Sequence, residues 1–241
     1  MVRSDRVAAV IPCRNEAPRL GAVLAAVRAH IPAVIVVDDG SDDSTAEVAR
    51  MAGAEVIRYP QSEGKGAALM AGWRLAAERG FEFAVCLDGD GQHAGLDIPA
   101  FLQVPGEVSL VVGNRFGDAS RMPWLRRQVN RWMSRKLSRL SGHHLPDTQC
   151  GFRRLRLDVL RRLDLEARHF EIESDMILKT IRAGLDVQFV PVAVIYRDEQ
   201  SKIRPVRDTI RWFRWWRRVT NGPRRAGAIQ ESGVTAESMG A

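Results

Sequence analysis

The 241-residue sequence has no apolar run near the ~18 residues that a membrane-spanning helix needs, so we expect no integral membrane segment. Its first apolar stretch, residues 7–11, is shorter than the apolar core of a secretory signal peptide, and secretion is therefore not expected. Cysteine is also scarce, because only Cys13, Cys86 and Cys150 occur and no two of them form a CxxC metal spacing. Reduced thiols in a cytoplasm are the simplest interpretation.

Basic and acidic side chains are distributed unevenly along the chain, and two segments have almost no acidic side chains. Residues 1–114 carry only 10 basic side chains against 15 acidic ones. Residues 115–140 carry eight basic side chains with Asp118 as the single acid, and residues 202–225 carry nine with Asp208 as the single acid. The formal net charge of +7 is therefore concentrated in two segments. An acidic-leaning body with two basic segments indicates a polyanionic partner.

The composition, 45% apolar and 27% charged, excludes a disordered chain and allows one sizeable domain. Apolar periodicity predicts strands over residues 7–11, 33–37, 55–58, 81–87, 108–112 and 187–195. It predicts helices over residues 17–29, 44–52, 65–79, 97–103, 124–140, 157–163, 173–183 and 205–219. Strands that alternate with helices are typical of an α/β fold, a mostly parallel sheet flanked by helices.

Polar residues follow three of the predicted strands at the point where each strand ends. These segments are Asp38-Asp39-Gly40-Ser41, Asp88-Gly89-Asp90-Gly91-Gln92-His93 and Gly113-Asn114-Arg115. In open α/β sheets the ligand crevice lies outside the carboxyl ends of the strands. We therefore expect the three strand ends to form one composite site.

The Asp88-Gly89-Asp90 element suits a hard divalent cation. One or two carboxylates together with substrate phosphates are the ligands that Mg²⁺ or Mn²⁺ prefers, and Gly89 would let a diphosphate approach the backbone closely. An acidic turn is the alternative interpretation. For Asp38 and Asp39 the alternatives are an Asx-type turn, or a carboxylate that accepts hydrogen bonds from a base or a ribose.

Two other glycine-rich or histidine-rich segments do not match known ligand motifs. Gly64-Lys65-Gly66 lacks the last glycine of a dinucleotide fingerprint. It also lacks the first glycine of a Walker motif and the Ser or Thr that follows the Walker lysine. His143-His144 has no partner at metal-ligand spacing. The sequence therefore gives no support to a kinase-type or NAD-type function.

The ordered motifs in residues 10–16, 36–45 and 87–93 resemble family 2 glycosyltransferases, which have the GT-A (Rossmann-like) fold. Residues 113–116, 126–130, 147–153 and 201–202 are similar to those of the dolichyl- and polyprenyl-phosphate mannose and glucose synthases. The resemblance covers roughly residues 6–204. It implies a GT-A catalytic domain over residues 1–204, followed by a basic aromatic helix over 205–225 and a flexible tail over 226–241.

The resemblance also implies a role for individual residues. Four residues would hold the nucleoside: Pro12, Arg14, Glu16 and Asp39. Asp88, Asp90 and Gln92 would bind the metal, Mg²⁺ or Mn²⁺, and the diphosphate. Arg115 and Arg127 would meet the phosphate of the sugar or the acceptor, and Arg197 with Lys202 would close over the donor. The spacing of Arg197 and Lys202 is five residues, where six is expected in the mannose synthases.

These roles predict an inverting hexosyltransferase, with a donor of the GDP-mannose or UDP-glucose type and a polyprenyl phosphate acceptor. A phosphate monoester is already an anionic nucleophile and needs no strong base. A saccharide or small-molecule hydroxyl acceptor is the alternative, and it would need a base such as Asp147, Glu171 or Glu173. A basic nucleic-acid-binding protein is a second alternative, but that function leaves the three acidic strand ends unexplained.

Tryptophan and arginine occur together in residues 121–139 and 202–225. Aromatic side chains favour the bilayer interface, and basic residues are attracted to anionic lipid. This pattern predicts a peripheral protein on the cytoplasmic leaflet of an anionic membrane. Packing of the same helices against the protein core, with arginines extended along the surface, is the alternative.

Overall fold

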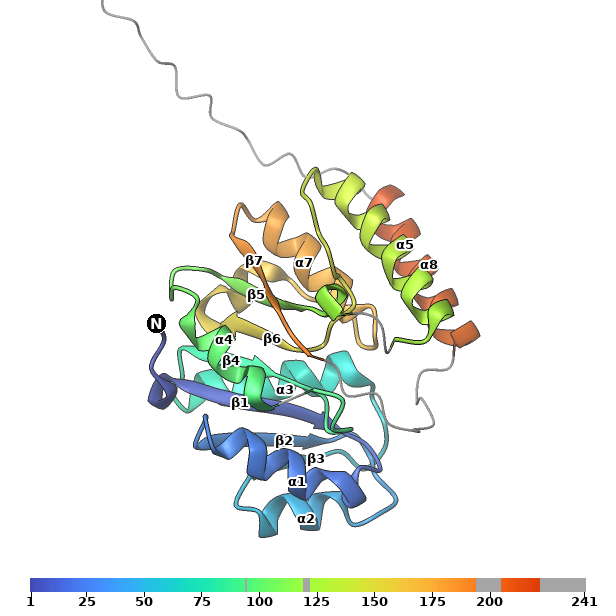
Figure 1. The fold of residues 1–241 in the computed structure, drawn as a ribbon. Helices are drawn as coiled ribbons and strands as arrows, with labels where there is room; N and C mark the ends of the chain where they lie inside the picture. Colours follow the sequence, from blue (N-terminus) through green and yellow to red (C-terminus); the bar gives the residue numbers. More distant parts are fainter. Residues whose placement is uncertain (94, 119–121, 194–204, 222–241) are drawn as a thin grey trace, which may run out of the picture.

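A computed structural model describes residues 1–93, 95–118, 122–193 and 205–221. The strands form one seven-stranded sheet in the order β3-β2-β1-β4-β6-β5-β7 (Figure 1). The strands are β1 Val7–Cys13, β2 Ala33–Asp38, β3 Glu55–Arg58, β4 Phe83–Cys86, β5 Leu110–Asn114, β6 Arg153–Arg156 and β7 Val187–Pro191. Only β6 runs antiparallel to its neighbours β4 and β5. The predicted α/β class with a mostly parallel sheet is confirmed.

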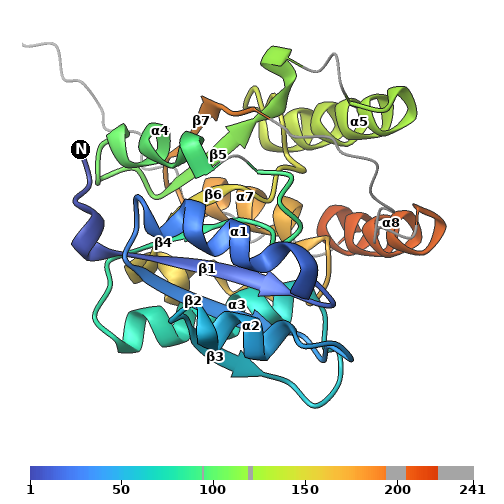
Figure 2. The ribbon, with the colours of Figure 1, turned by 60° about the horizontal axis from the view of Figure 1, so that its bottom comes forward.

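Helices pack on both faces of this sheet (Figure 2). They are α1 Ala17–Arg28, α2 Thr45–Met51, α3 Lys65–Glu78, α4 Ile98–Gln103, α5 Trp124–Ser141, α6 Leu160–Leu163, α7 Ile172–Arg182 and α8 Pro205–Asn221. The long helices α5 and α8 lie side by side at one end of the molecule, where the Trp132 and Trp212 ring centroids are 5.4 Å apart. No helix among the described residues is long and apolar enough to cross a membrane.

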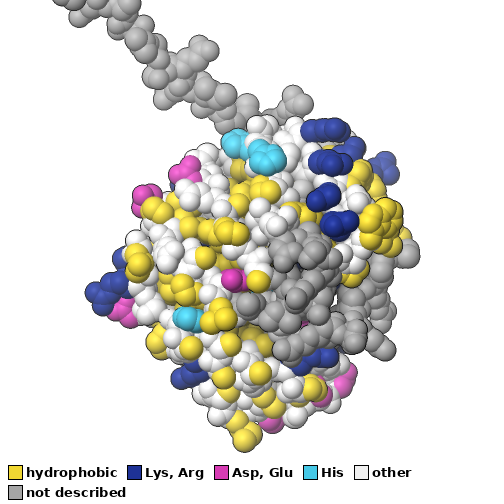
Figure 3. Space-filling view, in the orientation of Figure 1, with side chains coloured by type: hydrophobic (Ala, Val, Ile, Leu, Met, Phe, Trp, Pro, Cys, Tyr) yellow, Lys and Arg dark blue, Asp and Glu magenta, His cyan; other side chains and the backbone are white. Residues whose placement is uncertain are grey.

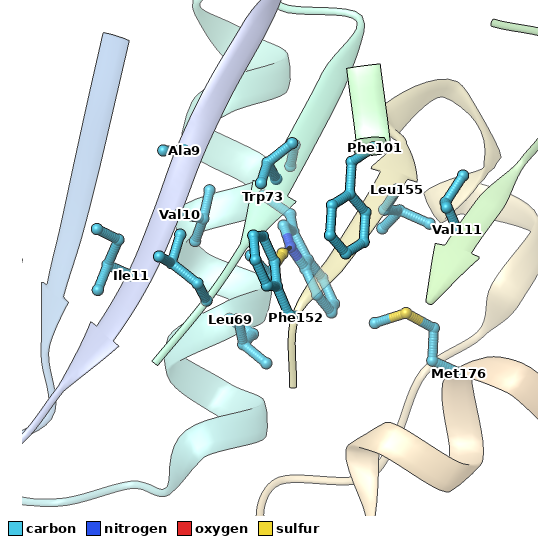
Figure 4. Packing of buried hydrophobic residues seen from close by; sticks show 14 of the residues in the cluster. Ala9, Val10, Ile11, Leu69, Trp73, Phe101, Val111, Phe152, Leu155 and Met176 are labelled. Carbon is cyan, nitrogen blue, oxygen red and sulfur yellow. Dashed lines mark hydrogen bonds between the residues drawn. The ribbon is translucent and has the colours of Figure 1, made fainter. Parts of the chain in front are cut away.

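The core is built around β1 and α3. The first five residues of β1 are fully buried, as expected of a central parallel strand that is covered on both faces. Trp73 on α3 is also fully buried, and its indole Nε1 donates a hydrogen bond to Cys86 Sγ at 2.9 Å. Figure 4 shows Phe101 and Phe152 stacked beside Trp73, with ring centroids 4.2 Å apart. This packing fixes the ends of β1 and β4, which carry the candidate site.

The sequence patterns did not predict β6, because they indicate a loop over residues 147–152 and a helix over residues 157–163 and leave residues 153–156 unassigned. The sequence of β6 is Arg-Arg-Leu-Arg, and three arginines in four residues do not form the apolar pattern that is typical of a buried strand. Arg153 and Arg154 are nevertheless buried, because backbone carbonyls satisfy their guanidinium groups. Arg153 donates to the carbonyls of Cys150, Thr148 and Glu173, and Arg154 donates to those of Phe101, Val104 and Pro105. Burial lowers the pKa of Arg154 to about 10.

The direction of β6 has a consequence for the site. Because β6 is antiparallel, its first residue Arg153 pairs with Cys86 at the end of β4 and with Val112 near the end of β5. The loop of residues 147–152 therefore lies at the same sheet edge as the polar ends of β4 and β5.

Helix α8 packs against α7 through two buried tryptophans. The Nε1 atom of Trp212 donates to Ser174 Oγ at 3.1 Å, and that of Trp215 donates to Asp175 Oδ1 at 2.9 Å. These two side chains belong to the core and do not face a membrane. The strand expected over 187–195 ends at Pro191, and its last two residues lie outside the described residues. The tail predicted over 226–241 lies outside them too.

Candidate active site

The loop after β4 carries Asp88, whose carboxylate lies in a partly buried ion-pair network. Lys65 Nζ lies 2.6 Å from Asp88 Oδ1 and 2.8 Å from Glu173 Oε1. His93 Nε2 is 3.6 Å from the other Asp88 oxygen. Burial alone would raise the pKa of Asp88, but the Lys65 ammonium and His93 hold it well below its ordinary value. Asp88 is therefore an anion whose charge is compensated by Lys65.

Asp90 has the opposite electrostatic environment. Its Oδ1 accepts a hydrogen bond from the Gln92 backbone N–H at 2.9 Å, which closes the turn. Burial and then the negative charge of Asp88 raise the pKa of Asp90 above its ordinary value. The two carboxylates are thus close enough to repel each other.

This donor set fits a divalent cation. Two mutually repelling carboxylates are hard ligands, and a dication would relieve their repulsion. Among the described residues no group of three or more His, Cys, Asp or Glu side chains could hold a metal by itself. A Mg²⁺ or Mn²⁺ ion that takes further ligands from substrate phosphates needs no such cage.

Gly89 lies against the end of β1. A Cβ atom there would come within 2.5 Å of Cys13 Sγ, so the backbone of the loop needs a glycine at this position. Among the predicted nucleoside-binding residues near this contact, Glu16 is buried, Pro12 is half-buried and Arg14 is exposed. The Glu16 backbone N–H donates to Thr45 Oγ1 at 2.9 Å, which ties the start of α1 to α2.

Asp39 follows β2 and holds the loop that leads into α3. Its backbone N–H donates to the Cys13 carbonyl, and its buried carboxylate accepts hydrogen bonds from Ser62 Oγ and the Glu63 N–H, both at 2.7 Å, and from the Gly64 N–H. Asp39 therefore links β1, β2 and the first residues of α3, where Lys65 begins the helix.

Arg115 follows β5 and is buried in an ion pair with Asp147. Its Nε lies 2.7 Å from Asp147 Oδ2, and a second guanidinium nitrogen lies 2.9 Å from Oδ1. Burial would raise the pKa of Asp147, but Arg115 keeps it below its ordinary value. Arg127, on the first turn of α5, is half-buried, and its Nε has no hydrogen-bond partner in the described part of the chain.

Gly151 connects the Arg115–Asp147 pair to Asp88. A Cβ atom at Gly151 would lie 2.9 Å from both Asp88 Oδ2 and Lys65 Nζ, so the loop that contains Asp147 closes directly over the Lys65–Asp88 pair. The expected convergence of the three strand ends is thus present. Asp39 binds the backbone of Gly64 beside Lys65, Lys65 pairs with Asp88, and the 147–151 loop connects Asp88 to Arg115. Arg197 and Lys202 lie outside the described residues.

Lys65 is the site residue that sequence reasoning missed. The Gly64-Lys65-Gly66 segment does not match known nucleotide-binding motifs, so the motifs gave no reason to place Lys65 in the site. Its flanking glycines were the available signal, since a Cβ on Gly66 would come within 2.3 Å of the Ala167 carbonyl and one on Gly64 would overlap His169. The same segment places the Phe170 ring 5.6 Å from Lys65 Nζ. The glycines let the 167–170 segment cover the start of α3 and enclose the lysine.

The structure defines an α/β protein with acidic turns at the carboxyl edge of a mostly parallel sheet, and comparison with known sequences identifies its family. The sequence model of the family described as Glycosyl transferase family 2 matches residues 8–164. The chain belongs to this family. The resemblance noted from the sequence motifs is therefore confirmed.

Named relatives share roughly a third of their residues with the chain. An undecaprenyl-phosphate mannosyltransferase from Micrococcus luteus is 32% identical over 207 residues, which cover 80% of this chain and 85% of the relative. A polyprenol monophosphomannose synthase from Mycolicibacterium smegmatis is 30% identical, with 81% and 79% covered. A dolichyl-phosphate hexose transferase from Haloferax volcanii is 31% identical, with 83% and 88% covered.

Solved structures share the fold at lower sequence identity. Glucosyl-3-phosphoglycerate synthase from Mycobacterium tuberculosis, in complex with Mn²⁺, uridine diphosphate and phosphoglyceric acid, superposes with a TM-score of 0.66 at 23% identity. The match covers 86% of this chain and 74% of that one. Mannosyl-3-phosphoglycerate synthase from Rubrobacter xylanophilus gives a TM-score of 0.63 at 21% identity, with 95% and 78% covered.

Proposed function

We propose that this protein transfers a hexose from a nucleotide-diphosphate sugar to a polyprenyl phosphate. The relatives at 30–32% identity are named for this type of reaction. The structural observation that carries the proposal is that the 147–151 loop joins the Lys65–Asp88 pair to the Arg115–Asp147 pair at one sheet edge. This network supports the proposal because it combines carboxylates that could hold a cation with basic groups that could bind phosphate.

In this proposal Asp88, Asp90 and Gln92 hold a divalent cation, and Pro12, Arg14, Glu16 and Asp39 surround the nucleoside. When bound, the cation supplies positive charge to the departing diphosphate. Lys65 is a fixed ammonium, because Asp88 and Glu173 raise its pKa despite its burial. In this proposal its positive charge acts on the negative charge that develops on the leaving group, because a preorganised charge stabilises a transition state without rearrangement.

The acceptor phosphate is assigned to Arg115 and Arg127. Arg127 Nε is buried and has no hydrogen-bond partner in the described ranges, so it is available for an anionic oxygen. Arg115 is oriented by Asp147 and carries the remaining donors of its guanidinium. A phosphate held by these arginines would attack the anomeric carbon directly and invert its configuration, while Arg197 and Lys202 would close over the donor.

A hydroxyl acceptor is the second candidate, since the phosphoglycerate synthases share the fold. It needs a general base, and two of the three acids considered for that role are already engaged. Asp147 is ion-paired with Arg115 and its pKa is lowered, and Glu173 is ion-paired with Lys65. These pairings favour the phosphate acceptor, which needs no base.

We also propose that the protein acts at the cytoplasmic leaflet of a membrane. On α5 and α8, Trp124, Leu125, Trp132, Ile210 and Phe213 are exposed, in contrast to the buried Trp212 and Trp215. The Trp132 ring contacts Phe213 at a centroid distance of 5.5 Å, so the exposed apolar side chains of the two helices adjoin each other. Flotation with anionic vesicles at low salt, and release at high salt, would support this placement. A protein that stays unbound under both conditions would contradict it.

The transfer proposal is tested with purified protein and a panel of radiolabelled GDP- and UDP-sugars. Each donor is paired with undecaprenyl phosphate or with a soluble hydroxyl acceptor, in the presence of Mg²⁺ or Mn²⁺. We expect that a single donor of the panel yields a labelled glycolipid that is extracted into organic solvent and is labile to acid. Label transferred to the hydroxyl acceptor, and none to the lipid, would establish the second candidate instead.

A further inference from the structure

A groove of about 400 Å³ lies between α5 and the segment of residues 143–146. Its lining combines three arginines with two serines, a histidine and three apolar residues. The arginines are Arg131, Arg135 and Arg139, which follow one another at four-residue spacing and therefore lie in one row along the helix. Figure 3 shows basic side chains gathered in a column over α5.

In the part of the chain that the structure describes, no acidic side chain neutralises the positive charge of this groove. Residues 122–146 contain no Asp or Glu at all. Within the described ranges, no carboxylate forms an ion pair with Arg131, Arg135 or Arg139, whereas other arginines such as Arg6, Arg79 and Arg156 do pair with acids. Three aligned guanidinium groups that repel each other are destabilising unless an anion binds between them.

The walls of the groove are held in place. Arg131 lies over the Phe116 ring, with 5.4 Å between its guanidinium carbon and the ring centroid. Ser134 Oγ accepts a hydrogen bond from the Thr148 N–H at 3.0 Å, and Ser138 Oγ accepts one from the Leu145 N–H at the same distance. These bonds fix the 145–148 segment to α5, so the groove is preorganised.

The groove is separate from the candidate active site. Its lining includes none of the residues assigned to the donor, the cation or the acceptor phosphate. It adjoins that site, however, because Phe116 follows Arg115, and because Thr148, which Ser134 holds, follows Asp147. An occupant of the groove would therefore contact the protein beside the loop that orients Arg115.

We propose that this groove binds the phosphate group of an anionic molecule other than the nucleotide sugar and the acceptor. Planar guanidinium groups match the oxygens of a phosphate better than a diffuse set of lysines would, and charge-assisted bonds to phosphate are the strong class of hydrogen bond. The same chemistry is offered by a soluble phosphate ester and by the headgroup of an anionic lipid.

The test compares two double variants of equal charge. Arg135→Gln/Arg139→Gln removes two groove arginines, and Arg74→Gln/Arg161→Gln removes two exposed arginines from α3 and α6. Isothermal titration with inorganic phosphate is expected to show binding that weakens at least about tenfold in the groove variant only, since one charge-assisted hydrogen bond is worth roughly that factor. Unchanged thermal unfolding confirms that both variants are folded.

A second arm identifies the source of the phosphate. Flotation with phosphatidylcholine vesicles, with and without phosphatidic acid, is run on the same variants. If only the groove variant loses flotation, the site binds a lipid headgroup. If both variants float equally and only the groove variant loses binding of inorganic phosphate, the site binds a soluble ester. The proposal is overturned if neither probe distinguishes the groove variant from the control. Both arms lack nucleotide sugar and polyprenyl phosphate, so the result is independent of the transfer reaction.

Discussion

Lys65 Nζ lies 2.6 Å from Asp88 Oδ1 and joins the first residue of α3 to the acidic turn that follows β4. The same ammonium contacts Glu173 on α7, so three elements far apart in sequence share one buried positive charge. Removal of that charge would leave two carboxylates without compensation, which is costly for buried groups.

We expect Lys65→Met to reduce transfer by about a hundredfold or more, since this is the usual effect of removing one preorganised electrostatic group. The same variant should also lower the free energy of unfolding. Lys65→Met/Glu173→Gln should recover part of the stability, because one uncompensated carboxylate is gone, but should not recover transfer. Chemical denaturation and initial rates measure the two effects separately. Equal stability of the single and double variants would contradict the ion-pair account.

Gly151→Ala tests the contact between the 147–151 loop and the Lys65–Asp88 pair. The added Cβ atom would lie 2.9 Å from both polar atoms and should displace them. Misplacement by about 1 Å can reduce a rate by up to a hundredfold, so we expect a loss of ten- to a hundredfold in kcat. Gly21→Ala, in α1, is the matched control, because its Cβ would meet only Val48 at 4.0 Å. A full rate for Gly151→Ala would show that the loop does not constrain the pair.

Asp147→Asn should destabilise the protein by about 3 kcal/mol or more at neutral pH, because Arg115 is then buried without its counter-charge. The folded-state pKa of Asp147 lies below the ordinary 3.8. The stabilisation that the ionised Asp147 carboxylate contributes is therefore complete above pH 3.8. It is lost as the pH falls through the pKa that Asp147 has in the folded state.

The difference in unfolding free energy between the native sequence and Asp147→Asn should accordingly shrink with acidification below about 3.8. Urea titrations over a pH series measure this difference. A difference that is independent of pH would show that the carboxylate charge of Asp147 does not stabilise the fold.

Sequence patterns predicted much of the fold, for a physical reason. The parallel strands β1, β2 and β4 are continuous apolar runs that end at polar turns, so both the strands and their functional ends are visible locally. Strand β6 was not predictable in this way. Its arginines are buried only because carbonyls from other segments satisfy them, as Phe101 and Val104 do for Arg154.

The same limit applies to the candidate site. The Asp88-Gly89-Asp90 turn was identified because the motif is local, and the comparisons confirm the family. The pairing of Arg115 with Asp147 spans 32 residues and depends on the antiparallel direction of β6. The role of Lys65 depends on Glu173 from a distant helix. Such pairings are set by tertiary packing and leave no local pattern.

The buried thiols provide a test of the packing near the site. Burial raises the pKa of Cys86 to about 12 and that of Cys150 to about 11. Because the thiolate is the reactive form, both should resist alkylation at mildly alkaline pH in the folded protein and react after denaturation. Peptide mapping after iodoacetamide treatment measures each site. Rapid labelling of Cys150 in the native protein would show that the 147–152 loop is not packed as described.

We propose that Asp90, in the turn that follows β4, takes part in the transfer chemistry and does not support the fold. The most direct measurement is the rate of hexose transfer to undecaprenyl phosphate by Asp90→Asn, relative to the native sequence, at saturating Mg²⁺ or Mn²⁺. Thermal unfolding of both proteins serves as the folding control. We predict that transfer is nearly abolished while the unfolding temperature is maintained. A full rate for the folded variant, or undiminished turnover of the native protein after exhaustive chelation, would contradict the account.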